Sequence, residues 1–205
     1  MSQLARLLYP DLYQQSPKRI YNRVNKNLRT LQSESLLKSK NYGFGMDTLW
    51  SLTGHKIVRD FGYAPPKAQI HRYKYEHEKA CADVFVTLAL TEKLHGWEAH
   101  TKIGKDIIPD RTADYGGTVY IEVEMGSQDK IRQKADAYRQ HFYQNKQPFS
   151  VWFLVDTDKL YQSGLEDLRD FPQYYSLQKL DEFHDYFRSD TQSDSSQNDT
   201  TEELT

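Results

Sequence analysis

Three acidic residues near the middle of the chain have the types and spacing of a metal site. Asp110 directly follows Pro109, and Glu122 and Glu124 alternate along the segment 120–124. Side chains of a β-strand alternate between its faces, so the two glutamates share one face while the intervening apolar residues point to the other. With Asp110 on the neighbouring strand, three carboxylates would converge, and such oxygens are the ligands that Mg²⁺ or Mn²⁺ prefers. A site of this kind suits metal-assisted phosphodiester hydrolysis.

The helix predicted after this strand, from Gln128 to about Asn145, adds candidate side chains. Lys130, Lys134 and Tyr138 recur at intervals of four, which places them along one helical face. In one interpretation a lysine here reaches a scissile phosphate and stabilises its developing charge. In the other, both lysines are solvated and the tyrosine belongs to the core.

The preceding helix, predicted over 75–95, carries two further candidates. Asp83 stands in an otherwise apolar stretch, and a buried acid is costly unless it is paired or binds a cation. His77 is either a general base or metal neighbour, or a hydrogen-bonded structural histidine. Glu98, beside Trp97, is a third acid whose orientation the sequence leaves open.

Strands and helices alternate through this part of the chain, which predicts an α/β domain with a mixed sheet. The remaining elements are a strand over 97–103, a hairpin of 106–110 with 118–124, a strand over 149–155, a helix over 165–170 and an edge strand over 174–180. The strand over 149–155 is almost wholly apolar, as expected for burial on both faces. Residues 189–205 contain no basic or aromatic residue and are predicted to be disordered.

The N-terminal part is strongly basic. Residues 1–75 carry thirteen Lys or Arg and four Asp or Glu, a net charge of +9, whereas the remainder carries fourteen and twenty-five, a net charge of −11. Such asymmetry favours contact of the first part with a polyanion, the alternative being a solvated basic face without a partner.

The pattern of this basic part predicts a winged helix-turn-helix. Helices are expected over 2–9 and from Ser16-Pro17 to about Ser33, followed by a hairpin of 36–39 with 48–52 and a last helix over 55–61. The second helix buries a stripe of Ile20, Val24, Leu28 and Leu31. Off this stripe lie the residues expected to contact the major groove of double-stranded DNA: Lys18, Arg19, Asn22, Arg23 and Lys26. A small helical domain for protein contacts is the alternative.

Composition excludes some classes of protein. The chain has 205 residues and one cysteine, Cys81, so an internal disulfide framework and a cysteine-based zinc site are excluded. We find neither a signal peptide nor an apolar run of membrane-spanning length, and we therefore expect a cytoplasmic protein without membrane contact.

The acidic pattern resembles the PD-(D/E)xK nuclease superfamily, which has the restriction-endonuclease-like fold. Asp110 and Glu122 match its two acids, whereas Glu124 stands where a lysine is usual. The resemblance implies a site for Mg²⁺ or Mn²⁺ at Asp110, Glu122 and Glu124, with Lys134 as the candidate replacement for the missing lysine.

A longer resemblance, reaching to about Val155, is to the replication-relaxation family of plasmids and other mobile elements. The matching motifs are His77 with Asp83, Trp97, Pro109-Asp110, Glu122-Val123-Glu124-Met125-Gly126, and Lys134 with Tyr138. The resemblance implies a winged-helix domain followed by a nuclease-like domain. With the linker and the tail that composition predicts, the expected boundaries are 1–63 for the winged helix, 64–70 for the linker, 71–188 for the nuclease-like domain and 189–205 for the tail.

Three functions follow as expectations. The first is a relaxosome-type DNA-binding protein of plasmid replication or mobilisation, acting as an Mg²⁺-dependent endonuclease. The second is a catalytically silent scaffold that recruits a relaxase or replication proteins, and the third is a transcriptional regulator with an effector-binding second domain. Because winged helices often bind half-sites in pairs, a homodimer is expected in each case.

Overall fold

The computed structural model describes residues 2–41, 49–53, 60, 74–99, 101–104, 107–126, 129–145, 148–170 and 173–195. The chain divides into two compact units, Met1–Glu78 and Lys79–Thr205. No helix in these described ranges combines the length and the apolar character needed to cross a membrane.

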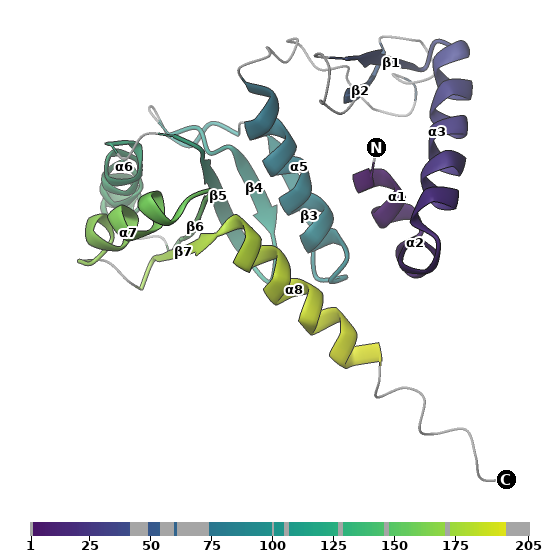
Figure 1. The fold of residues 1–205 in the computed structure, drawn as a ribbon. Helices are drawn as coiled ribbons and strands as arrows, with labels where there is room; N and C mark the ends of the chain where they lie inside the picture. The colour runs from purple at the N-terminus through teal and green to yellow at the C-terminus, as the bar shows by residue number, and fades with distance from the viewer. Residues whose placement is uncertain are drawn as a thin grey trace, which may run out of the picture. The chain divides into compact units, whose positions relative to one another are not determined.

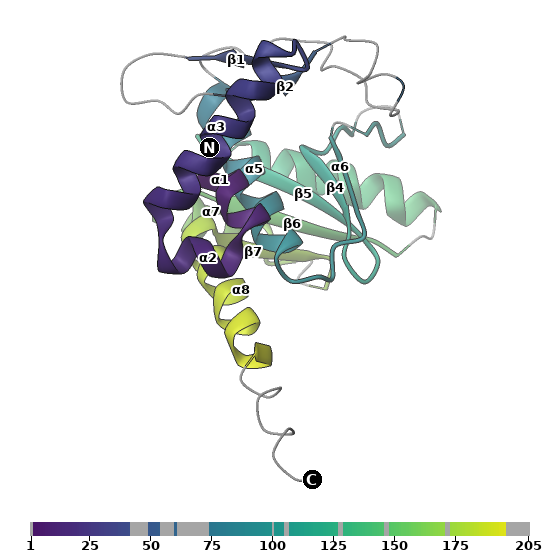
Figure 2. The same ribbon diagram turned by 90° about the vertical axis from the view of Figure 1, so that its right-hand side faces the viewer.

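The first unit consists of short helices and a hairpin. Its elements are α1 (Ser2–Leu8), α2 (Pro10–Gln15), α3 (Pro17–Ser33), β1 (Leu37–Lys40) and β2 (Leu49–Leu52) (Figures 1 and 2). Proline is the first residue of both α2 and α3, where its missing N–H costs nothing. The predicted basic helix is therefore confirmed, while α2 was not expected from the sequence.

The core of this unit forms along one face of α3. Ile20, Val24 and Leu28 are buried together with Ala5 of α1. The prediction that Leu31 completes the stripe is wrong, since 37% of its surface is exposed. The buried stripe ends at Leu28, and the hairpin residues Leu37 and Trp50 pack against the same core.

The predicted hairpin is present. β1 and β2 pair antiparallel, with Leu37 opposite Leu52. The tip of the hairpin, the linker over 64–70 and most of the helix predicted over 55–61 lie outside the described residues.

The second unit is a five-stranded sheet covered on both faces. Its elements are α5 (Tyr75–Ala89, which begins before the boundary), β3 (Gly96–Ala99), β4 (Arg111–Asp114), β5 (Thr118–Glu124), α6 (Asp129–Asn145), β6 (Ser150–Val155), α7 (Asp158–Asp167), β7 (Tyr175–Lys179) and α8 (Leu180–Ser195). The strand order is β3-β4-β5-β6-β7. The first three strands pair antiparallel and the last three pair parallel, which confirms the predicted α/β class with a mixed sheet.

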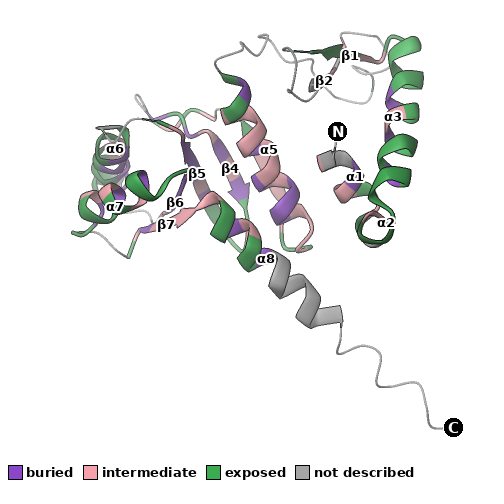
Figure 3. Ribbon diagram, viewed as in Figure 1, coloured by how far each residue is buried: buried purple, intermediate pink, exposed green. Residues whose placement is uncertain are grey.

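Two hydrophobic cores lie on opposite faces of this sheet. One packs α6 and α7 against inward-facing residues of β6, including Val151 and Phe153. The other packs α5 and α8 against β5 and β6 through Val84, Ile121 and Phe183. The layers are seen edge-on in Figure 1, and Figure 3 shows the buried strands between helices with exposed outer sides.

Several predicted boundaries are corrected. The first strand of the central hairpin is β4, which begins at Arg111 rather than ending at Asp110, because Pro109 has no N–H to donate to a ladder. The helix α5 stops at Ala89 rather than at His95, and Glu92 then adopts a left-handed φ of 60° in the turn toward β3.

The C-terminal half shows three more differences. The strand predicted over 97–103 is the shorter β3, and the helix predicted over 165–170 is instead α7, which Thr157 caps by accepting the Leu160 N–H at 3.3 Å. The helix α8 was not predicted and continues to Ser195, so the disordered tail does not begin at Ser189. Its aromatic residues Phe183 and Phe187 anchor it to the sheet.

Candidate functional site

The two glutamates of β5 are buried on the side of the sheet that α6 covers. Glu122 is 1% exposed and Glu124 is 4% exposed. The residues that alternate with them, Ile121 and Val123, pack under α5 and α8. The predicted alternation is thus confirmed, and it places two carboxylates in the interior, where an uncompensated charge is costly.

Asp110 joins this pair from the turn that precedes β4. Its Oδ2 accepts a hydrogen bond of 2.9 Å from the main-chain N–H of Val123, between the two glutamates. The following residue, Arg111, is buried, and its guanidinium donates to the main-chain oxygen of Asp110 at 2.5 Å. The carboxylate of Asp110 is therefore fixed against β5 although it does not lie on a strand.

Lys134 of α6 places its ammonium among the three carboxylates. Its Nζ forms ion pairs with Oε2 of Glu122, with Oε1 of Glu124 at 2.6 Å and with Oδ2 of Asp110 at 3.8 Å. We call Asp110, Glu122, Glu124 and Lys134 the carboxylate–lysine cluster. The ammonium of Lys134 is thus shared among all three acids.

Tyr138 lies one turn along α6 from Lys134 and also contacts the cluster. Its hydroxyl donates to Oε1 of Glu122 at 2.7 Å, while Lys134 contacts the other oxygen. The i, i+4 spacing of these two residues makes this arrangement possible. The ion pairs of Lys134 contradict the interpretation in which both lysines are solvated, whereas the exposed Lys130 and the core position of the Tyr138 ring agree with it. The contact of a lysine with a scissile phosphate stays a prediction.

Burial and neighbouring charge set the protonation of the cluster. Burial raises the pKa of Glu122 to about 7 and Asp110 adds to the rise, against the opposing effects of Lys134 and Tyr138. Burial lowers the pKa of Lys134, but the carboxylates outweigh it and leave the pKa raised, so the ammonium stays charged. Burial, with the charge of Glu122, also raises the pKa of Tyr138, which stays protonated and able to donate.

The donor set fits a hard divalent cation in its chemistry. Three carboxylates supply oxygen ligands of the type that Mg²⁺ and Mn²⁺ prefer. Oε1 of Glu124 is buried and accepts no hydrogen bond in the described structure, although it is ion-paired with Lys134. Within the described ranges, no three acidic, histidine or cysteine side chains are set around a common ion position. The position between the carboxylates is taken by Lys134, so a metal would have to displace it.

The other predicted site residues have different surroundings. Lys130 is exposed one turn before Lys134. Asp83 pairs with Lys79 at 3.3 Å within α5, and Glu98 accepts a hydrogen bond from Thr101 at 2.8 Å. His77 is half-buried on α5 and belongs to the first unit. None of these contacts is part of the carboxylate–lysine cluster.

The predicted DNA-contacting residues all lie exposed on α3 of the first unit. The set comprises Lys18, Arg19, Asn22, Arg23 and Lys26. The seventeen residues of α3 include five basic and no acidic residues. Figure 3 shows the outer side of this helix as exposed. Its charge therefore has no counterpart within the helix itself.

Shallow concavities run along this basic helix. One of about 480 Å³ is lined by residues that include Lys18, Arg19 and Asn22, and another of about 470 Å³ by residues that include Asn22 and Lys26. The guanidinium of Arg23 lies 5.3 Å from the centre of the Tyr9 ring, a cation–π contact that orients it.

Two contributors were missed at the level of sequence. Arg111 was not singled out, although an arginine directly after the Pro-Asp pair is visible in the sequence. Tyr9 was placed only as the end of a helix, and its contact with Arg23 depends on how α1 packs against α3, which no local pattern reveals.

Comparison of this chain with protein-family models, with curated proteins and with solved structures found no match.

Proposed function

We propose that the second unit is a metal-dependent nuclease domain of the PD-(D/E)xK type. The observation that supports this proposal is the convergence of Asp110, Glu122 and Glu124 on the ammonium of Lys134. Buried acids gathered at one point repel one another unless a cation is held among them.

The element order supports the same proposal. The order α5, β3, β4, β5, α6 and β6 agrees with the helix, strand, hairpin, helix and strand that the sequence pattern predicts. Lys134 supplies from α6 the positive charge that position 124 lacks.

Each side chain of the cluster then has a defined task. Asp110, Glu122 and Glu124 would hold the cation, and Tyr138 would keep Glu122 oriented after Lys134 moves aside. Lys134 is partly exposed, so its freed ammonium can bind the scissile phosphate and stabilise the charge that develops there. When bound, the cation supplies an acidified water and polarises the phosphate.

The first unit supports a role on DNA. Its order of helices, basic helix and hairpin agrees with a winged helix-turn-helix, in which α3 enters the major groove. More specifically, we propose a relaxosome-type protein of plasmid replication or mobilisation. It would bind double-stranded DNA as a homodimer, together with a relaxase or replication proteins.

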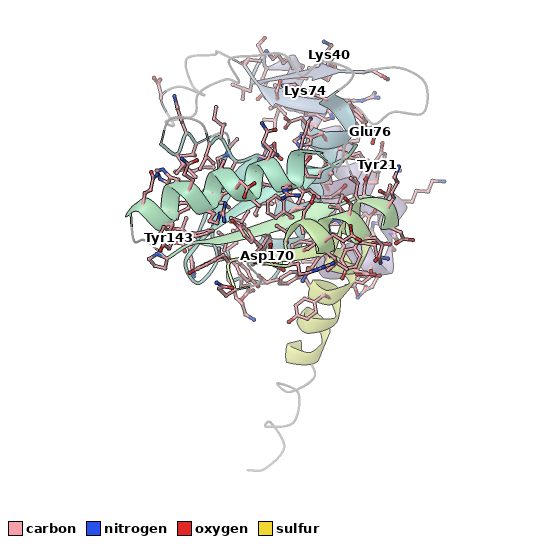
Figure 4. The ribbon with its side chains drawn as sticks, turned by 90° about the vertical axis from the view of Figure 1, so that its left-hand side faces the viewer. Tyr21, Lys40, Lys74, Glu76, Tyr143 and Asp170 are labelled. Carbon is pink, nitrogen blue, oxygen red and sulfur yellow. The ribbon has the colours of Figure 1, made fainter. Side chains whose placement is uncertain are left out.

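A plasmid-nicking assay with Mg²⁺ or Mn²⁺ tests the proposed chemistry. Asp110→Asn keeps an oxygen that can accept the Val123 N–H, so the variant should fold, yet it should lose nicking. Asp170→Asn is the matched control, because this residue is exposed beyond α7 (Figure 4). Equal nicking by the wild type, Asp110→Asn and Asp110→Ala would contradict the proposal.

A catalytically silent scaffold is the second candidate, and one observation favours it. Lys134 already neutralises part of the acidic charge, which leaves the cluster stable without a metal. Calorimetric titration with Mn²⁺ separates the two functions. The nuclease should bind Mn²⁺ in a manner that depends on Asp110, and the scaffold should show no such binding.

A further inference from the structure

A concavity in the second unit lies on the face of the sheet opposite to the carboxylate–lysine cluster. It has a volume of about 350 Å³, within the range of about 300–1,000 Å³ usual for small-ligand sites. Trp152 of β6 and Phe183 and Phe187 of α8 form its aromatic wall. Ser176 and Gln178 of β7 also line it.

Both polar residues lie half-buried on β7, the edge strand of the sheet. The register sets Ser176 beside Trp152 and Gln178 beside Leu154, on the face that α8 covers. In the parts of the chain that are described, neither side chain is engaged in a hydrogen bond. A hydroxyl and an amide beside an aromatic wall are suited to a ligand that brings its own donors and acceptors.

The aromatic wall favours a flat ligand. Tyr115 meets the Trp152 ring edge-on at 5.8 Å between centroids, and Phe183 meets it at 6.0 Å. These contacts fix the indole, which is nevertheless only half-buried. A rigid, partly exposed indole is a stacking platform for a planar ring.

A charged residue at the rim of the concavity restricts which flat ligands fit. Lys93, an exposed residue in the turn before β3, also lines the concavity. Aromatic cages for quaternary ammonium ligands rely on attraction of a cation, which a lysine would oppose. A lysine favours a ligand that carries an anionic group in addition to its flat ring.

We propose that this pocket binds a single unpaired nucleotide. Its base would stack on Trp152 and meet Ser176 and Gln178 with its polar edge, and its phosphate would lie near Lys93. This inference goes beyond the proposed nuclease function, since it concerns other residues on the other face of the sheet. The nucleotide is either free or the exposed unit of a single strand.

The test is a fluorescence titration of the full-length chain with dTMP and, separately, with a short oligo(dT). Both should quench tryptophan emission saturably, and Trp152→Phe should remove the quench while Trp50 and Trp97 remain. Binding of oligo(dT) alone would identify a strand, and equal binding of dTMP would identify a free nucleotide. Thymidine and inorganic phosphate, titrated alone, should each bind more weakly than dTMP.

Two further variants keep the test independent of any folding defect at Trp152. Gln178→Ala and Lys93→Met should each weaken dTMP binding about fivefold, the value of one hydrogen bond or ion contact of about 1 kcal/mol. Lys159→Met, an exposed lysine of α7, is the control for Lys93 and should bind normally.

Two results would overturn the inference: no saturable quench with either probe, or a quench by dTMP that persists in Trp152→Phe. Asp110→Asn should bind dTMP as the wild type does, so failure of the nuclease proposal is distinguishable from failure of this one.

Discussion

The carboxylate–lysine cluster and the surface of α3 are both concentrations of charge, but they are balanced in opposite ways. In the cluster, Lys134 pairs with three acids, two of which are almost fully buried. On α3, five basic residues share a helix with no acid, and the residues predicted to bind DNA are exposed. The charges of the cluster are compensated inside the fold, whereas the charges of α3 face the solvent or a partner.

This difference separates a buried, paired group of charges from an exposed one. Buried charge contributes to stability as well as chemistry, because each member that is removed leaves its partners uncompensated. Exposed charge contributes little to stability and acts mainly on binding, with a strong dependence on salt. Substitutions in the cluster should therefore lower stability, whereas substitutions on α3 should weaken binding with little change in stability.

The largest effect is expected for Lys134→Met, which leaves three acids without their cation. We expect a loss of about 3 kcal/mol in the free energy of unfolding, measured by urea denaturation. Added Mn²⁺ should restore part of this loss if the acids hold the metal. Lys130→Met, one turn earlier and exposed, should change stability by less than about 0.5 kcal/mol. Equal effects of the two variants would mean that the three acids do not depend on Lys134 for compensation of their charge.

Tyr138→Phe should have the next largest effect. It leaves Oε1 of Glu122 without its hydrogen-bond donor in a buried site, which costs about 1–3 kcal/mol. The matched control is Tyr143→Phe on the same helix, where Tyr143 is 82% exposed (Figure 4). Thermal denaturation of both variants measures the difference, and a Tyr138→Phe variant as stable as the control would show that this bond contributes nothing.

The raised pKa of Glu122 predicts that stability depends on pH through the cluster. Since burial raises this pKa from 4.5 to about 7, the folded state binds the proton more tightly than the unfolded state. The free energy of unfolding should therefore fall as pH rises from about 4.5 to about 7. Glu122→Gln should lose this contribution in urea denaturation at pH 5 and pH 7.5. An unchanged pH dependence in Glu122→Gln would contradict the assignment.

The smallest stability effects are expected on α3. Arg19→Ala should change the free energy of unfolding by less than about 0.5 kcal/mol yet weaken DNA binding, with the slope of log K against log salt reduced by about 0.9. Arg23→Ala should also weaken and flatten binding, with an added loss of its contact with Tyr9. Gel shifts at several salt concentrations measure both, with Lys159→Ala as the control. If neither the affinity nor the slope changes, α3 does not bind DNA.

The sequence predicted those elements whose side chains repeat with a clear period. The alternation of β5 and the i, i+4 face of α6 were readable because each depends on a period of two or four residues. The position of Lys134 among all three acids was not readable, since it depends on how α6 crosses β5. The pocket at Trp152 was missed for a similar reason: Ser176 and Gln178 become notable only when α8, itself unpredicted, covers them.

The most direct test of the account is a crystal structure grown with Mn²⁺ and examined by anomalous scattering. The account predicts an anomalous peak bound by Asp110 and Glu122, with the Lys134 ammonium moved away from the acids. A structure at saturating Mn²⁺ that shows no peak there, with Lys134 still paired to all three carboxylates, would contradict it.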